Sequence, residues 1–202
     1  ERWGCEVERI WHKGRRRPAG TELLVSPGGF SYGDYLRSGA IARFANVMES
    51  VQEYASKGGK VLGICNGFQI LLEAGLLPGA MKRNDSLHFI SKYHTLKVIN
   101  NDNTFLSLLK KDEVLNIPVA HHDGNYFIDD KGLKELEQNG QILLKYCDKD
   151  GNLTNMNGSV SNIAGICNKE KNVFGLMPHP ERAIEELLGS TDGINMLKGF
   201  LQ

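Results

Sequence analysis

The sequence lacks several features that would assign it to a specialised class of protein. Its 202 residues include 24 basic and 24 acidic side chains, and the zero net charge argues against a general nucleic-acid or membrane-surface binder. No apolar run approaches the length of a membrane span, and no signal peptide is visible. The four cysteines form no Cys-x-x-Cys pair, so neither a zinc knuckle nor a disulfide framework is indicated, and a reducing cytoplasm is the simplest setting.

The sequence also lacks internal repeats, low-complexity segments and linkers, so we expect one domain over residues 1–202. The first part alternates strand and helix patterns, a β-rich part follows, and a helical tail closes the chain, which predicts an α/β fold. Because the chain opens on what resembles the last turn of a helix, we expect a preceding N-terminal strand to be missing from this sequence. Strands are predicted over residues 7–11, 22–26, 61–64, 89–99, 114–119, 142–147, 163–166 and 173–177, and helices over 39–57, 104–111, 131–139 and 194–201.

Residues 60–72 predict a short apolar strand that turns sharply at Cys65 into an amphipathic helix. Gly63 and Gly67 flank the cysteine at i−2 and i+2, which is the pattern of a nucleophile elbow with Cys in place of Ser. Glycine suits these positions because larger side chains would collide in so tight a turn. A thiol at the helix N-terminus is expected to be favoured as the thiolate. The alternative is a buried structural cysteine beside a packing glycine.

Residues 27–34 form a glycine-rich stretch after a predicted strand. The adjacent Gly28 and Gly29 allow backbone N–H groups to point outward, as an oxyanion hole requires. A dinucleotide-binding fingerprint would need G-x-G-x-x-G leading into a helix, and this spacing is absent here. A simple glycine-rich turn is the alternative.

A cysteine nucleophile needs a base and a group that orients the base. His179 follows a predicted strand and lies between two prolines, which fix the local backbone and hence the direction of the imidazole. Glu181 is two residues further on, and residues i and i+2 of an extended segment project to the same side. This is the logic of a Cys-His-Glu triad. The alternative is a surface turn made by two prolines.

The cluster His121-His122-Asp123 suggests a metal site at first sight. Adjacent residues at a strand end point to opposite faces, so the two imidazoles rarely bind one ion. No cysteine or carboxylate pair with ligand spacing supports a metal, and we expect none.

Three segments together resemble the class I (triad) glutamine amidotransferases: residues 27–29, 63–69 and 178–181. Within that family, residues 27–37, 66–69 and 178–182 are similar to the glutaminase subunits of phosphoribosylformylglycinamidine synthase, an enzyme of purine biosynthesis. The likeness covers residues 22–201. It implies a flavodoxin-like doubly wound sheet of the class I glutaminase type, with a strand before Glu1.

The resemblance further implies that glutamine is hydrolysed and its ammonia is passed to a partner. Cys65 would attack the side-chain amide carbon, His179 would act as acid and base, and Glu181 would orient His179. The candidates for the oxyanion hole and the glutamine pocket are Gly28, Gly29, Phe30, Asn66 and Gln69.

In the family, the partner is a large ATP-dependent synthetase subunit that converts formylglycinamide ribonucleotide to the amidine, and a small third subunit often joins. This chain has no ATP-binding motif. We therefore expect no cofactor in this subunit, with ATP and Mg used by the synthetase.

Two departures from the family pattern concern residues 120–126 and 154–158. The first stretch usually reads His-Gly-Glu-Gly, and here His122 and Asp123 differ; the second lacks a proline often found there. Two alternatives stay open, namely another hydrolase of the same fold and a non-catalytic scaffold. Residues 30–37 and 66–69 favour the purine-pathway glutaminase over another hydrolase, and the intact Cys65, His179 and Glu181 speak against a scaffold.

Overall fold

The computed structural model describes residues 3–201, in which seven strands form one mixed sheet in the order β1-β2-β9-β8-β7-β4-β5. The parallel part consists of β1 (Leu23–Ser26), β2 (Lys60–Ile64) and β9 (Val173–Leu176). The antiparallel part consists of β8 (Ile163–Cys167), β7 (Ile142–Cys147), β4 (Ile90–Val98) and β5 (Val114–His121). A separate two-stranded ladder pairs β3 (Ala80–Lys82) with β6 (Asn125–Phe127).

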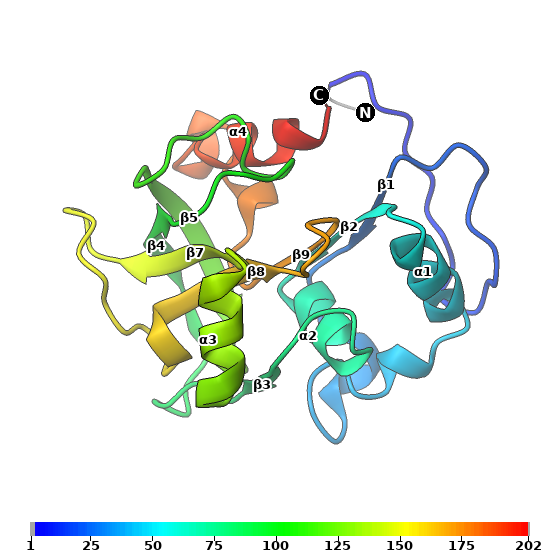
Figure 1. Ribbon diagram of the computed structural model, residues 1–202, viewed down its shortest axis with the longest axis horizontal. Coiled ribbons are helices and arrows are strands. Elements are labelled where there is room, and N and C mark those ends of the chain that lie inside the picture. The colour runs from blue at the N-terminus through cyan, green and yellow to red at the C-terminus, as the bar shows by residue number, and fades with distance from the viewer. Residues whose placement is uncertain (1–2, 202) are drawn as a thin grey trace.

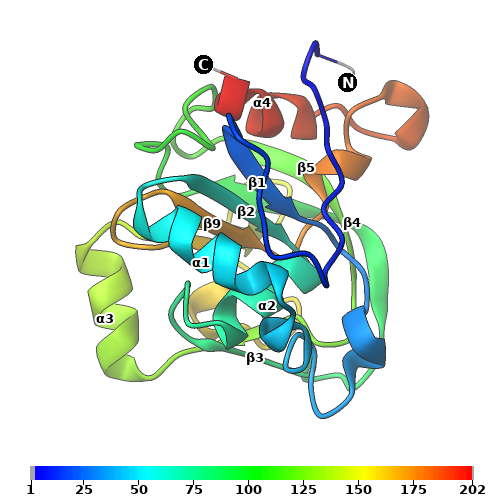
Figure 2. The ribbon, with the colours of Figure 1, turned by 90° about the vertical axis from the view of Figure 1, so that its right-hand side faces the viewer.

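Helices pack on both sides of the parallel part of the sheet. Figures 1 and 2 show α1 (Val47–Ser56) and α2 (Asn66–Glu73) on one side and α4 (Gly193–Lys198) on the other. The remaining α-helix, α3 (Asp130–Gln138), is capped at its N-terminus by Asp129, whose side chain accepts a hydrogen bond from the backbone N–H of Gly132. None of the helices in residues 3–201 is long and apolar enough to span a lipid bilayer.

The core follows the alternation of the strands. Every second residue of β5 is buried, namely Leu115, Ile117, Val119 and His121. The imidazole of His121 therefore lies on the same face of the strand as three apolar side chains. The rings of Phe105, Phe174 and Phe200 lie 5.3–5.9 Å apart. This aromatic cluster is buried, and it joins the C-terminal segment to β9.

The sheet curls so that its last strand returns to its parallel part. β5 is at the end of the strand order, yet the carbonyl of Pro118 accepts a hydrogen bond from the backbone N–H of His179 at 2.8 Å. The carbonyl of Ala120 lies 3.6 Å from Sγ of Cys65. The outer edge of β5 therefore faces the two residues that the sequence marks as nucleophile and base.

The predicted α/β fold of the class I glutaminase type is confirmed. Two predicted elements are wrong. Residues 7–11 form no strand and are largely exposed, with Trp11 at 68%, because no described strand offers them a ladder partner. Residues 104–111 form turns instead of a helix, because Phe105, Leu106 and Leu109 are inserted into the core and local packing overrides helix propensity.

Two other predictions need adjustment. The helix predicted over residues 39–57 begins at Val47, and a short 3₁₀ turn over Ala42–Phe44 precedes it. The helical turn expected at the start of the chain rests partly on residues 1 and 2, which lie outside the described residues.

Candidate active site

The elbow at Cys65 has the strained geometry that the sequence predicts. Cys65 has φ 51° and ψ −105°, an unusual conformation for a residue with a side chain, and it precedes the first turn of α2. A Cβ atom on Gly67 would lie 1.9 Å from the carbonyl oxygen of Ser26, and one on Gly63 would lie 2.8 Å from the backbone of Gly67. The two glycines are thus required by backbone packing on both sides of the cysteine.

The thiol of Cys65 is buried, with 5% of the residue exposed. Burial raises its pKa to about 11, although the backbone N–H of Asn66 at the start of α2 favours the thiolate. The expectation that the helix N-terminus would lower this pKa is therefore wrong, because the loss of hydration outweighs the helix dipole. The thiol keeps its proton at neutral pH, so it needs a base.

His179 and Glu181 lie as the sequence predicts. Nδ1 of His179 lies 2.6 Å from Oε1 of Glu181, and the imidazole is 1% exposed. A carboxylate accepts only, so Nδ1 carries a proton, and in the neutral ring the free lone pair is on Nε2. Among the described residues, this Nε2 has no hydrogen-bond partner, although it is fully buried. The ring is thus held in the tautomer that a general base requires.

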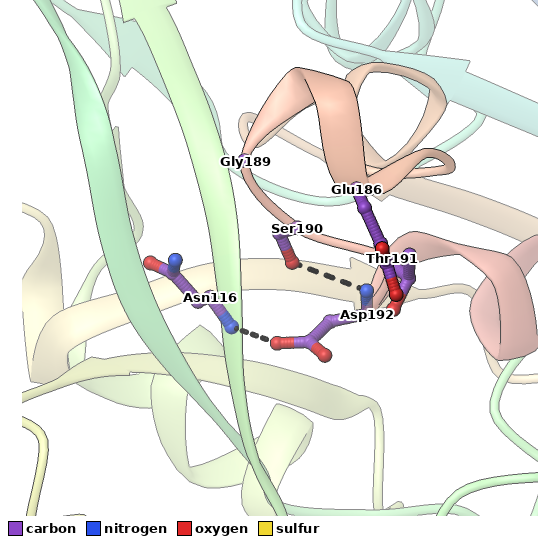
Figure 3. Close-up of a pocket in the computed structure, with 6 residues that line it drawn as sticks. All are labelled: Asn116, Glu186, Gly189, Ser190, Thr191 and Asp192. Carbon is purple, nitrogen blue, oxygen red and sulfur yellow. Dashed lines mark hydrogen bonds between the residues drawn. The ribbon is translucent and has the colours of Figure 1, made fainter.

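The segment that follows Glu181 is fastened to β5. The carboxylate of Asp192 accepts a hydrogen bond from the backbone N–H of Asn116 at 2.7 Å, and Oγ of Ser190 accepts one from the N–H of Asp192 (Figure 3). A Cβ atom on Gly193 would lie 2.0 Å from the carbonyl of Pro180. The shallow hollow of about 340 Å³ between these residues contains none of the predicted site residues. The contacts of Asp192 with β5 and of Gly193 with Pro180 hold the turn that carries Glu181.

The glycine-rich stretch lies directly beside Cys65 and His179. A Cβ atom on Gly28 would lie 2.7 Å from Cε1 of His179 and 3.6 Å from Cβ of Cys65. The side chain of Asn66 accepts hydrogen bonds from the backbone N–H and the hydroxyl of Ser31, at 3.0 and 2.7 Å. The turn that contains Gly29 and Phe30 is thereby tied to the elbow. The ring of Phe30 itself points into solvent and is 76% exposed.

Gln69 faces the turn that follows β5. Its Nε2 donates to the carbonyl of Asp123 at 2.7 Å, and its Oε1 accepts from the side-chain amide of Asn66 at 2.9 Å. The carboxylate of Asp123 accepts from the hydroxyl of Ser38 at 2.8 Å and lies 2.9 Å from Nδ1 of His122. These contacts of Ser38 and Asp123 carried no signal in the sequence, where Asp123 stood out only as a departure from the family pattern.

The two adjacent histidines diverge. His121 is 3% exposed and its Nδ1 contacts the side chain of Asn84, whereas His122 contacts Asp123. Within residues 3–201, no group of three or more His, Cys, Asp or Glu side chains is arranged to hold a metal ion.

Comparison with known proteins finds a family that matches most of the chain and a solved structure of the same fold. Residues 8–193 match the family model described as CobB/CobQ-like glutamine amidotransferase domain. The chain is 68% identical over 199 residues to the phosphoribosylformylglycinamidine synthase subunit PurQ of Sulfurimonas denitrificans, covering 98% of this chain and 89% of that protein. It is 55% identical to the subunit of the same name from Campylobacter jejuni, covering 100% of this chain and 86% of that protein.

Among solved structures, the chain is similar to one in the structure of PurLQS from Thermotoga maritima. The TM-score is 0.82 and the identity 44%, over 92% of this chain and 81% of the other.

Proposed function

This chain belongs to the CobB/CobQ-like glutamine amidotransferase family, among the PurQ subunits of phosphoribosylformylglycinamidine synthase, and from that membership we propose how its site works. We propose that a triad of Cys65, His179 and Glu181 hydrolyses glutamine and supplies ammonia to a synthetase subunit. That subunit would convert formylglycinamide ribonucleotide to formylglycinamidine ribonucleotide. The observation that carries the proposal is the 2.6 Å contact between His179 and Glu181 beside a strained, buried cysteine elbow.

In the first step, sulfur of Cys65 attacks the side-chain amide carbon of glutamine while Nε2 of His179 takes the thiol proton. The raised pKa of the thiol supports this order of events, because a protonated thiol needs a base at the moment of attack. Glu181 holds the other ring nitrogen and stabilises the imidazolium. The oxyanion is bound by backbone N–H groups of Gly29 or Phe30 and of Asn66, each worth about 3 kcal/mol of transition-state stabilisation.

In the second step, the imidazolium gives its proton to the departing nitrogen and the carbon–nitrogen bond breaks. Ammonia leaves, and a glutamyl thioester remains on Cys65. His179 then removes a proton from water, which attacks the thioester carbon. The carbon–sulfur bond breaks, glutamate leaves, and the thiol recovers its proton. Glutamine and water are consumed, glutamate and ammonia are formed, and no oxidant or cofactor is needed in this subunit.

Residues 30–44 support docking of a partner beside the site. Tyr35, Leu36 and Phe44 are 74%, 89% and 72% exposed, and they follow in the chain the turn that Asn66 ties to the elbow at Ser31. Exposed apolar side chains gathered in one place mark protein–protein contact sites. The occupant we propose is the large synthetase subunit, with a small accessory subunit in the same cytoplasmic complex. That synthetase subunit would use ATP and Mg, and this chain would need no cofactor.

The test uses a complex reconstituted from this chain, the synthetase subunit and the small subunit. Cys65→Ala should lower glutamine-dependent synthesis by about 10³-fold or more, because the nucleophile is lost, and should leave ammonia-dependent synthesis unchanged. Cys167→Ala is the matched control, since Cys167 is equally buried and the pKa of its thiol is also raised to about 11. Equal glutamine-dependent rates in Cys65→Ala and wild type would show that this chain is a non-catalytic scaffold.

Chemical labelling gives a second check. A glutamine-analogue electrophile should modify Cys65 and leave Cys147 and Cys167 untouched, as peptide mass spectrometry would detect. Labelling mainly at Cys147 or Cys167 would remove Cys65 from its proposed role.

A further inference from the structure

The turn at residues 121–124, which begins at the last residue of β5, touches the proposed site from several directions. The carbonyl of Ala120, just before it, faces the thiol of Cys65 at 3.6 Å. The carbonyl of Asp123 accepts from Gln69 at 2.7 Å, and its carboxylate accepts from Ser38 at 2.8 Å. Whatever holds this turn therefore sets the shape of the proposed glutamine pocket.

Asn84 holds the turn. It is 0% exposed and comes from the loop after β3. Its Nδ2 donates to the carbonyls of His121 at 3.0 Å and His88 at 2.9 Å, and its Oδ1 accepts from the backbone N–H of Gly124 at 3.1 Å. Its own backbone N–H donates to the carbonyl of His122 at 2.9 Å. One side chain and one backbone group thus fasten the turn at three of its residues.

The same amide fixes the tautomer of His121. Two carbonyls can only accept and the N–H of Gly124 can only donate, so the partners define which end of the Asn84 amide is oxygen. Nδ1 of His121 lies 3.0 Å from that oxygen and must therefore carry the proton. Nε2 is left unprotonated, and it has no hydrogen-bond partner among the described residues.

A neutral His121 suits the proposed role of the neighbouring His179, which must become positively charged. Burial lowers the pKa of His121 to about 4, and the charge that His179 carries when it is protonated acts in the same direction. The influence is mutual, because a charge on His121 would oppose the imidazolium that His179 must become. The ring also packs against the turn itself, since a Cβ atom on Gly124 would lie 2.2 Å from its Nδ1.

We propose that Asn84 is a positioning residue for glutamine hydrolysis, which holds the turn at residues 121–124 and keeps His121 as the neutral Nδ1–H tautomer. The inference rests on the proposed function, because the pocket that Asn84 shapes is the proposed glutamine pocket. Among the described residues, Asn84 has no hydrogen bond to Cys65 or His179, so it acts through His121, His122 and Gly124.

The first experiment separates positioning from general stability in the reconstituted complex. Asn84→Ala should raise the KM for glutamine about ten-fold or more and leave ammonia-dependent synthesis unchanged. Asn172→Ala is the matched control, since Asn172 is 7% exposed and its Nδ2 also donates to two carbonyls, those of Ala55 and Gly59, both at 2.8 Å. Similar loss of melting temperature in both variants, with KM within two-fold of wild type in both, would overturn the proposal.

The second experiment follows the imidazole itself by ¹⁵N NMR of the full chain. Wild-type His121 should show a protonated Nδ1 and an unprotonated Nε2 from pH 8 down to pH 5. Asn84→Asp, which replaces an amide by a carboxylate of the same shape, should give a doubly protonated ring at pH 6. A wild-type ring protonated at Nε2, or unchanged in Asn84→Asp, would also overturn the proposal.

Asn84→Ser serves if the other variants do not fold, with the same KM and NMR criteria. A failure of the proposed function is recognised separately, because Cys65→Ala would then keep glutamine-dependent synthesis whatever the state of His121.

Discussion

The backbone at Gly28 leaves no room for a side chain between His179 and Cys65, and Gly28→Ala would fill that space. The added Cβ would lie 2.7 Å from Cε1 of His179 and 3.4 Å from its Nδ1. Gly28 does not have a positive φ, so alanine adds no backbone strain of the left-handed kind. The substitution is therefore a wedge against the imidazole with little other effect.

The size of the effect follows from the contact distance. Carbon atoms in ordinary contact are at least 3.4 Å apart, so the ring has to move by the difference from 2.7 Å, about 0.7 Å. A displacement of about 1 Å in a reacting group can cost about 10²-fold in rate. We expect the kcat for glutamine-dependent synthesis to fall by about 30-fold to 100-fold, which corresponds to roughly 2 to 3 kcal/mol in the activation free energy.

The assay compares glutamine-dependent and ammonia-dependent synthesis in the reconstituted complex. Ammonia bypasses the glutaminase site, so only the glutamine-dependent rate should fall. Gly20→Ala is a suitable control: the φ of Gly20 is 77°, and nothing lies within 4 Å of its Cβ, so it adds backbone strain without a wedge. A Gly28→Ala complex with a glutamine-dependent kcat within two-fold of wild type would refute the packing of Gly28 against His179.

Three further predictions concern stability and pH. Gly67→Ala should lower the melting temperature by about 6 to 12 °C, taking an overpacking cost of about 3 kcal/mol, because its Cβ would lie 1.9 Å from the carbonyl of Ser26; a change below 2 °C would contradict the elbow geometry. Alkylation of Cys65 by iodoacetamide in the free chain should accelerate about ten-fold per pH unit from pH 7 to pH 10, because its pKa is about 11, and a plateau below pH 7 would show a preformed thiolate. The pKa of His121 is lowered to about 4, so its contribution to the free energy of unfolding is present above pH 6.5 and is lost as the pH falls to 4. Urea titrations of wild type and His121→Gln should therefore converge on acidification, and parallel curves would contradict this.

The sequence was sufficient to predict the elbow and the His179–Glu181 pair. Both depend on local rules, namely helical periodicity, glycine at i±2 and the i, i+2 spacing of an extended segment. The same kind of rule predicted a helix over Thr104–Lys111 and was wrong there. The apolar residues of that segment are buried in the core without forming a helix. Local pattern is reliable where geometry is dictated within a few residues.

The rest of the site depends on contacts between distant parts of the chain. Asn84 meets His121 across 37 residues, Gln69 meets Asp123 across 54, and Ser38 meets Asp123 across 85. No periodicity connects such positions. The protonation state of Cys65 was also out of reach, because the competition between burial and the helix dipole depends on how deeply the fold encloses the thiol.

The curl of the sheet that brings β5 back to Cys65 and His179 also determines when the chain acquires its chemistry during folding. Cys65 meets Ala120 across 55 residues, and Pro118 meets His179 across an even longer stretch of chain. Contacts between residues so far apart close after the local helices and hairpins have formed. We therefore expect Cys65, His179 and the end of β5 to come together late in folding. A partly folded chain would then carry Cys65 without the proposed base beside it, and labelling of Cys65 by a glutamine-analogue electrophile during refolding would measure when the proposed site forms.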